Sequence, residues 1–213
     1  MPAKITRIQR TKQGRFALFC DAGFLFSVDG ETLLKHQVEE GDLFTDRELD
    51  DLREASDERR AKDKALVYLS LRDHGFVELL KKLERSFDHD TALAAVRAME
   101  GLGLIDDQAF AAHRAKYLVE TQGRSLREAA QKMRELGLDK ELISASLEPY
   151  EETGADNAAA LILKKYAHKL RQGEVQKVLA ALQRRGYTYG EAKQALAAAV
   201  RELEIQEDDN EVF

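Results

Sequence analysis

The chain has 213 residues and a formal net charge of −6; 44% of the residues are hydrophobic and 34% are charged, so the chain can bury a substantial core. It contains no apolar run of the roughly 20 residues that cross a membrane, and its single cysteine excludes an intrachain disulfide and any multi-cysteine metal site. Because the start, MPAKITRIQR, lacks the apolar core of a signal peptide, we expect a cytoplasmic protein with no membrane association.

Three short segments at the start of the chain have the composition of β-strands. Residues 4–11, 15–20 and 24–28 are rich in β-branched and aromatic side chains and are separated by the turns Lys-Gln-Gly and Asp-Ala-Gly. They predict a three-stranded antiparallel meander in which Cys20 is a small buried side chain. A short helix over residues 31–38 completes the small β-rich domain that we expect over residues 1–53.

A signal for the start of a long helix follows at Thr45. Thr45 and Glu48 have the spacing of a capping box, in which the hydroxyl accepts from a free helix N–H and the carboxylate reaches back to the cap. From here the pattern is helical to the end of the chain. Residues 53–64 are too highly charged to be core on any face, so we expect an exposed helical connector, with a flexible linker as the alternative.

The helical part of the chain contains a weak internal repeat. Leu83, Met133 and Leu182 occupy matching positions in three amphipathic segments, at intervals of 50 and 49 residues. After the second and third of these anchors, three signals recur: a helix-ending glycine, a helix-capping residue and a closing leucine (Gly137, Asp139 and Leu147; Gly186, Thr188 and Leu196). Each unit fits three helices, and units of this size are expected to stack on one another. Chance similarity among amphipathic helices is the alternative.

The repeat predicts the organisation of the whole chain. We expect a connector with the first three-helix repeat over residues 54–106, a second repeat over 107–152 and a third over 153–203. Residues 204–213 form an acidic tail that we expect to be disordered. The predicted fold class is mainly α, with tandem three-helix repeats in an elongated, curved array behind the small β-rich domain.

Adjacent carboxylates at Asp106 and Asp107 suggest either a metal or acid–base site or the start of a helix. With Asp106 as the N-cap, Asp107 meets the positive end of the helix dipole, and Ile105 and Phe110 have the spacing of a hydrophobic staple. Gly103 lies where the preceding helix needs a left-handed C-cap. We therefore interpret this motif as structural.

The sequence contains no recognisable set of catalytic residues. Its five histidines lack metal-binding spacing, and there is neither a nucleophile elbow nor a P-loop. Gly101 and Gly103 lack the strand-to-helix context of a dinucleotide fingerprint. We therefore expect no enzymatic activity, no metal and no cofactor.

Positive charge gathers in two blocks that the net charge of the chain hides. Residues 111–134 hold six Lys or Arg against two acids, residues 164–185 hold seven against one, and residues 202–213 hold six acids and no base. The thirteen basic residues are Arg114, Lys116, Arg124, Arg127, Lys132, Arg134, Lys164, Lys165, Lys169, Arg171, Lys177, Arg184 and Arg185. Stacked repeats with similar rotation would bring them to one basic face for an anionic partner. Ordinary solvated helix surface is the alternative.

Three groups of residues carry a resemblance to a known family. They are Leu104-Ile105-Asp106-Asp107 followed by Phe110-Ala111, Ala65 with Tyr68-Leu69-Ser70, and Glu78-Leu79 with Lys82-Leu83. In these residues the chain resembles the RecX recombination regulators over roughly residues 60–200, and its β-rich start is similar to an N-terminal extension of some members. His74-Gly75 departs from the Ser-x-x-Glu helix start of many members, which leaves the capping of this helix open.

The resemblance implies a non-enzymatic modulator of the RecA recombinase. Such proteins bind in the groove of the RecA–single-stranded DNA filament and restrain strand exchange, ATP hydrolysis and co-protease activity. For this chain we expect a monomer that contacts the RecA filament, and single-stranded DNA through it, with the basic residues above. The alternative is a direct DNA-binding regulator, because a three-helix unit can also be a helix-turn-helix.

Overall fold

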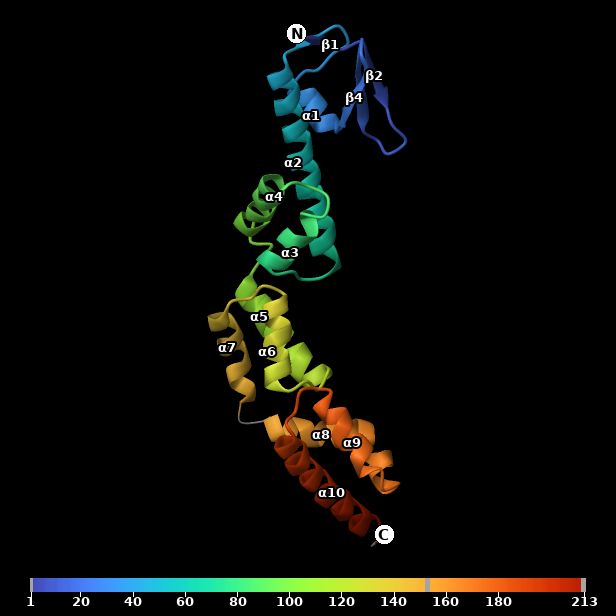
Figure 1. The fold of residues 1–213 in the computed structure, drawn as a ribbon, viewed down its shortest axis with the longest axis vertical. Helices are drawn as coiled ribbons and strands as arrows, with labels where there is room; N and C mark the ends of the chain where they lie inside the picture. The colour runs from blue at the N-terminus through green and yellow to red at the C-terminus, as the bar shows by residue number, and fades with distance from the viewer. Residues whose placement is uncertain (1, 152–153, 212–213) are drawn as a thin grey trace. The chain divides into compact units, whose positions relative to one another are not determined.

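The computed structural model describes residues 2–151 and 154–211, without the side chains of residues 154–155 and 205–211 (Figure 1). The chain divides into two compact units, Met1–Asp106 and Asp107–Phe213, which are described one at a time. The predicted domain boundaries within these units stay predictions. The boundary expected at 152–153, and the last two residues of the expected tail, lie outside the described residues.

The first unit starts with the predicted meander. Strands β2 (Arg7–Arg10), β3 (Phe16–Cys20) and β4 (Gly23–Val28) form an antiparallel sheet in the order β2-β3-β4, which confirms the prediction. A second antiparallel ladder pairs β1 (Ala3–Lys4) with β5 (Leu43–Phe44). The sequence did not indicate this ladder, because strands of two residues are too short to show an alternating pattern.

One face of the three-stranded sheet forms a core with the start of a long helix. Helix α1 (Gly30–Lys35) follows the sheet, and α2 (Asp46–Leu71) packs against it. The buried side chains of this core are Ile5, Leu18, Phe26, Val28, Val38, Leu49 and Leu52. Cys20 is only partly buried, contrary to the prediction, because it lies at the end of β3, opposite Gly23 beside the turn.

Helix α2 begins at the predicted capping box. The backbone N–H of Glu48 donates to Thr45 Oγ1 at 3.3 Å, and the N–H of Thr45 donates to Glu48 Oε2 at 2.7 Å. The helix runs without a break through residues 53–64, as the connector prediction required. The expectation that no face of this segment is core is wrong, since Ser56 and Ala61 are buried. Their small side chains allow an otherwise charged helix to pack closely.

Three helical groups make up the rest of the described chain. The first consists of the C-terminal part of α2 with α3 (Phe76–Leu83) and α4 (His89–Gly101). The second contains α5 (Asp107–Lys116), the π-helix η1 (Tyr117–Thr121), α6 (Leu126–Glu135), α7 (Lys140–Leu147) and the short 3₁₀ helix η2 (Glu148–Tyr150). The third contains α8 (Gly154–Arg171), α9 (Val175–Gln183) and α10 (Tyr189–Glu211).

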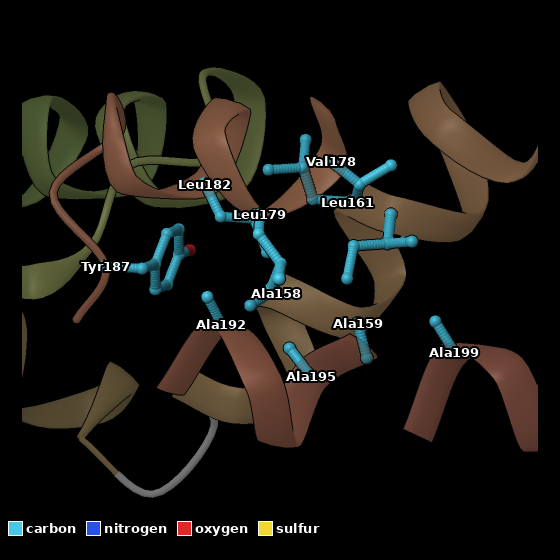
Figure 2. Close-up of a cluster of buried hydrophobic side chains, with 11 residues drawn as sticks. Ala158, Ala159, Leu161, Val178, Leu179, Leu182, Tyr187, Ala192, Ala195 and Ala199 are labelled. Carbon is cyan, nitrogen blue, oxygen red and sulfur yellow. The ribbon is translucent and has the colours of Figure 1, made fainter. Parts of the chain in front are cut away.

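The three predicted anchor residues lie in three separate cores. Leu83, Met133 and Leu182 have no exposed surface, and each belongs to the core of a different helical group. In the third group, small alanines of α10 face those of α8 and allow the two helices to approach closely, while Tyr187 lies at one end of the cluster (Figure 2). The mainly α class, with three-helix groups behind a small antiparallel sheet, is therefore confirmed.

The predicted glycine helix ends have the expected geometry. Gly137 and Gly186 have φ values of +89° and +86°, in the left-handed region that glycine adopts without strain. The next helices begin at the predicted caps: Asp139 accepts from the N–H of Leu142 at 2.7 Å, and Thr188 accepts from the N–H of Glu191 at 3.3 Å. These local signals place the turns between α6 and α7 and between α9 and α10.

Helix α10 continues to Glu211, into the segment 204–213 that was expected to be a disordered tail. No proline or glycine follows Gly190 that would end the helix earlier. The backbone of residues 204–211 is therefore helical rather than irregular.

Candidate functional site

The adjacent aspartates lie at a helix start, as the structural interpretation of the motif requires. Helix α5 begins at Asp107, directly after Asp106, and Gly103 ends the preceding helix with a φ of +70°. Ile105 packs in the core of the first helical group, whereas Phe110 packs in the core of the second. The predicted hydrophobic staple pairs these two residues with each other, whereas in the structure they belong to two different cores. Among the described residues, no cluster of His, Cys, Asp and Glu could hold a metal ion.

The two basic blocks meet inside the second unit, where the start of α6 contacts the turn between α9 and α10. The backbone N–H of Ser125 donates to the carbonyl of Arg185 at 2.9 Å. Arg127 Nη2 donates to the carbonyl of Gly186 at 2.9 Å, and the Tyr187 hydroxyl lies 3.4 Å from the carbonyl of Arg124. We call this contact between the second and third helical groups the seam.

Two glycines allow the backbones to approach at the seam. A Cβ atom on Gly123 would lie 2.7 Å from the Leu161 side chain, and one on Gly186 would lie 2.6 Å from Ser125 Oγ and 2.7 Å from Glu128 Cβ. All three distances are shorter than the contacts that a real Cβ atom makes with carbon or oxygen. Both glycines also have positive φ values, of +64° and +86°. The seam therefore depends on the absence of a side chain at these two positions.

A groove of about 420 Å³ opens along the seam. It is lined by Tyr117, Thr121, Gln122, Arg124, Lys165, Arg184 and Arg185. Among these described lining residues, four are Lys or Arg and none is Asp or Glu. We call it the basic groove. Its composition fits an anionic ligand such as a phosphate backbone, because Arg and Lys bind phosphate oxygens by charge-assisted hydrogen bonds.

The π-helix η1 shapes one wall of the basic groove. The N–H of Gln122 donates to the carbonyl of Tyr117 at 3.0 Å, five residues earlier, which widens the last turn before α6. Tyr117 and Thr121 are the first and last residues of this turn, and both line the groove. π-Helical turns occur often at functional sites, and no local pattern of residues indicates this one.

The opposite wall is held by contacts of Arg185. Its Nε lies 3.4 Å from the carbonyl of Gln122, and its guanidinium lies 5.8 Å from the centre of the Tyr166 ring. Lys169 lies 5.9 Å from the same ring. Arg185 is thus partly buried and fixed in place, whereas Lys165 and Arg184 are exposed.

The structure brings together only part of the predicted basic set. Arg124, Lys165, Arg184 and Arg185 line the basic groove, and Lys164 lines a neighbouring hollow of about 230 Å³ together with Lys165. The other predicted residues do not line the groove: Arg114, Lys116, Arg127, Lys132, Arg134, Lys169, Arg171 and Lys177.

Some predicted basic residues also have structural contacts. Arg124 and Lys132 lie 3.4 Å and 3.7 Å from Glu128, and Lys177 lies 2.5 Å from Glu174. The guanidinium of Arg114 lies 5.5 Å from the centre of the Tyr117 ring. The basic groove thus gathers four of the thirteen residues, and a single basic face made of all thirteen stays a prediction.

A partly buried polar cluster that the sequence did not reveal lies at the start of α3. Glu78 accepts from Arg72 Nη2 at 2.5 Å and lies 2.9 Å from Nδ1 of His74, a residue that is 3% exposed. Burial lowers the pKa of His74 below its usual 6.5, although Glu78 acts in the opposite direction. Burial alone would raise the pKa of Glu78, but hydrogen bonds from Arg72 and His74 lower it below its usual value. Gly75, the N-cap of α3, makes no side-chain capping hydrogen bond. The departure of His74-Gly75 from the Ser-x-x-Glu helix start was therefore the sequence signal that could have pointed to this cluster.

Comparison with known proteins gives consistent similarities. A Regulatory protein RecX from Listeria monocytogenes serotype 4a (strain HCC23) is 31% identical over 96% of this chain and 79% of its own length. A Regulatory protein RecX from Staphylococcus carnosus (strain TM300) is 24% identical over 98% of this chain and 79% of its own length. No protein-family profile matches the chain.

Two solved structures share the fold. A crystal structure of regulatory protein RecX superposes with a TM-score of 0.59 and 23% identity, over 92% of this chain and 99% of the other. The crystal structure of RecX from Lactobacillus salivarius gives a TM-score of 0.55 and 18% identity, over 68% of this chain and 97% of the other. None of the helices that the structure describes has the length and apolar content needed to cross a bilayer.

Proposed function

The chain belongs to the RecX family of regulatory proteins, and from this premise we propose that it binds the RecA–single-stranded DNA filament and inhibits its recombinase, ATPase and co-protease activities. Family membership over almost the whole chain is the observation that carries this proposal. The protein acts as a regulator in the cytoplasm, by binding and without chemistry of its own.

The basic groove supports a contact with the DNA that the filament encloses. Of its four basic lining residues, Lys165 and Arg184 are exposed, whereas Arg124 and Arg185 are partly buried. Such a cluster attracts a phosphate backbone without reading its sequence, because contacts to phosphates carry no base information. A regulator that follows a filament on any DNA sequence needs this kind of contact.

The distribution of basic residues favours the filament over the helix-turn-helix alternative. A helix-turn-helix reads bases with the helix that follows the tight turn. In the second and third groups this helix is α7 or α10. Helix α7 contains one basic residue, Lys140, beside the acidic Glu141, whereas the basic groove lies on the preceding helices and turns. The positive charge thus lies at the seam, where it can contact a DNA phosphate backbone rather than base edges.

The test is the DNA-dependent ATPase of RecA on single-stranded DNA. The wild-type protein should inhibit it and bind free duplex weakly. A double charge reversal, Lys165→Glu with Arg184→Glu, should raise the concentration for half inhibition by about tenfold or more, since each lost phosphate contact removes favourable charge interaction. Arg97→Glu with Lys193→Glu, at exposed positions on α4 and α10, makes the same change in charge outside the groove and should leave inhibition nearly unchanged.

Two outcomes would contradict these ideas separately. A sequence-specific footprint on duplex DNA, with no effect on RecA, would replace the filament proposal by the helix-turn-helix alternative. Full inhibition by the Lys165→Glu, Arg184→Glu protein would remove the groove from the proposal and leave the RecA partner in place. Arg124, Arg127 and Lys132 are less suitable for this test, because they also contact Glu128 or the carbonyl of Gly186.

We further propose that the protein acts as a monomer. Light scattering at the protein concentration of the ATPase assay should give the mass of one chain, 24.0 kDa. A dimer mass that persists on dilution would contradict this.

A further inference from the structure

The N-terminal sheet presents an aromatic and basic face that no part of the proposed function uses. Arg7 of β2 pairs directly with Phe19 of β3, and Phe19 pairs with Phe24 of β4. Directly opposed residues on neighbouring strands project to the same side of a sheet. The three side chains therefore form one row across the sheet, which we call the aromatic row.

The aromatic row lies on the face opposite the core. The core residues Leu18 and Phe26 pair with each other in the neighbouring register position, so their side chains project to the other side. A β-bulge makes this arrangement possible. Between Leu18 and Phe19 the register shifts, so that Phe19 pairs with Phe24 instead of Leu25, and Phe24 is brought out of the core to solvent.

The geometry of the aromatic row suits stacking. The Phe19 and Phe24 rings are 5.6 Å apart at an interplanar angle of 66°, and the Arg7 guanidinium lies 4.1 Å from the centre of the Phe19 ring. Phe24 is 60% exposed, which is unusual for a phenylalanine in a strand. An exposed ring next to a guanidinium offers a flat surface and a positive charge side by side.

The charge around the row points to an anionic ligand. Residues 2–20 contain five Lys or Arg and no Asp or Glu (Lys4, Arg7, Arg10, Lys12 and Arg15). Arg15 is engaged with the Ser27 carbonyl and with Ser56 Oγ, but Lys4, Arg7, Arg10 and Lys12 are exposed. The acids of this region include Asp21, in the turn after β3, and Glu40, which accepts from the backbone N–H of Ile8 at 2.7 Å.

We propose that the aromatic row is a binding face for single-stranded nucleic acid, with a base stacked on Phe24 and the backbone phosphates held by Arg7 and its basic neighbours. Single-stranded nucleic acid has what this face recognises: unpaired bases with flat surfaces and a negative backbone. A duplex hides its base faces, and an acidic peptide has no flat ring for Phe24. This contact requires neither RecA nor the basic groove.

Binding of a fluorescein-labelled oligo(dT) of about 16 nucleotides to the full-length protein, without RecA, tests the proposal. Phe24→Ala should weaken binding by about tenfold, the loss expected for one stacked base. Leu34→Ala, at a 77% exposed apolar position on α1, is the matched control and should bind as the wild type does. Arg7→Gln should weaken binding and reduce the slope of log K against log salt by about 0.7, the value for one phosphate contact on a single strand.

A tryptophan reporter tests stacking directly. The chain contains no tryptophan, so Phe24→Trp introduces a single fluorophore whose emission a stacked base should quench. Leu34→Trp is the control and should not be quenched. Oligo(U) is the second probe: quenching by both oligonucleotides, or by oligo(dT) alone, supports the proposal and identifies the accepted sugar.

The same titrations in the Lys165→Glu, Arg184→Glu protein separate this face from the basic groove. Quenching of Phe24→Trp should persist in that background even where inhibition of RecA is lost. Equal oligonucleotide affinities of the wild type and Phe24→Ala, together with unquenched Phe24→Trp, would overturn the proposal and favour a protein partner for this face. That result would leave the RecA proposal, which is read out by ATPase inhibition, untouched.

Discussion

The start of the second helix is built differently in the first and second helical groups. Before α3, Arg72 and His74 both contact the carboxylate of Glu78, a side chain that is 13% exposed. Before α6, Ser125 caps the helix by accepting from the N–H of Glu128 at 3.3 Å, and its own N–H donates to the carbonyl of Arg185. Matching positions of one repeat thus have two different sets of polar contacts.

The difference between the two helix starts determines whether the basic side chains nearby can still bind an anionic partner. At α3 a carboxylate lies among the basic groups, so the charge is neutralised within the fold. At the seam, Glu128 contacts Arg124 and Lys132 from outside the basic groove, whose described lining contains no carboxylate. Counting Lys and Arg along the sequence does not separate these two cases, because the position of one glutamate decides between them.

The largest expected loss of stability comes from a substitution that prevents the close approach of the backbones at the seam. Gly186→Ala should lower the free energy of unfolding by about 2–4 kcal/mol, because it combines a left-handed backbone with a Cβ that overlaps Ser125 and Glu128. Gly103→Ala is the matched control: its φ is also positive, but its Cβ would meet no atom within 4 Å, so it should cost only about 1 kcal/mol. Urea denaturation measures both, and equal losses would refute tight packing at Gly186.

The next effect compares the two glutamates. Glu78→Gln should destabilise the protein by about 2 kcal/mol, because it weakens charge-assisted hydrogen bonds of a largely buried group. Glu128→Gln should cost less than about 1 kcal/mol, since its contacts are longer and more exposed. Thermal and urea unfolding give both values. A larger loss for Glu128→Gln than for Glu78→Gln would contradict the view that the basic groups are neutralised more strongly at α3 than at the seam.

The pH dependence of stability should be steeper with His74 than without it. Because burial lowers the pKa of His74, its neutral form is favoured in the folded state, so the stabilisation is present above the unfolded pKa of about 6.5 and is lost as pH falls through the folded pKa. The lowered pKa of Glu78 adds a loss of the same sign at more acidic pH. His74→Gln should flatten the upper part of this curve, which has a limit of about 1.4 kcal/mol per pH unit for one group. An unchanged slope between pH 7 and 5 would contradict this.

The smallest effect concerns a single hydrogen bond across the seam. Arg127→Ala removes the donor to the carbonyl of Gly186 and should reduce the free energy of unfolding by about 0.5–1 kcal/mol. Arg134→Ala, at an exposed position near the end of the same helix, should have an effect within about 0.5 kcal/mol of zero. Chemical denaturation of the two variants side by side measures the difference, and losses of equal size would show that this bond contributes nothing.

The parts of the fold that could be predicted are those specified by neighbouring residues. The capping box at Thr45, the glycine helix end at Gly137 and the cap at Asp139 each depend on a few consecutive residues, and all were identified. The apolar periodicity likewise identified Met133 as a core residue. The bulge at Leu25 and the π-helical turn could not be predicted, because they depend on strand pairing and tertiary packing rather than on local propensity.

The site was predictable only as a list of basic residues. Arg124 and Arg185 were both named, but their meeting depends on Gly123 fitting against Leu161, a contact between residues 38 positions apart. A sequence shows the charge of each residue but not which carboxylates will lie beside it. The N-terminal aromatic row was missed for a different reason: Phe24 looks like an ordinary strand core residue until the bulge pairs it with Phe19 on the outer face.

The main-chain hydrogen bond between Ser125 and Arg185 has a consequence for the modularity of the C-terminal unit. Apart from proline at position 125, which lacks the N–H donor, no side-chain substitution at either residue removes this bond, so the second and third helical groups are coupled by their backbones. In a repeat protein such coupling makes neighbouring repeats fold and unfold cooperatively. A chain truncated after α7 would leave the Ser125 N–H without the carbonyl of Arg185 and Gly123 without the Leu161 side chain that packs against it. The second and third repeats should therefore melt in one transition, and neither should be transferable alone to another protein.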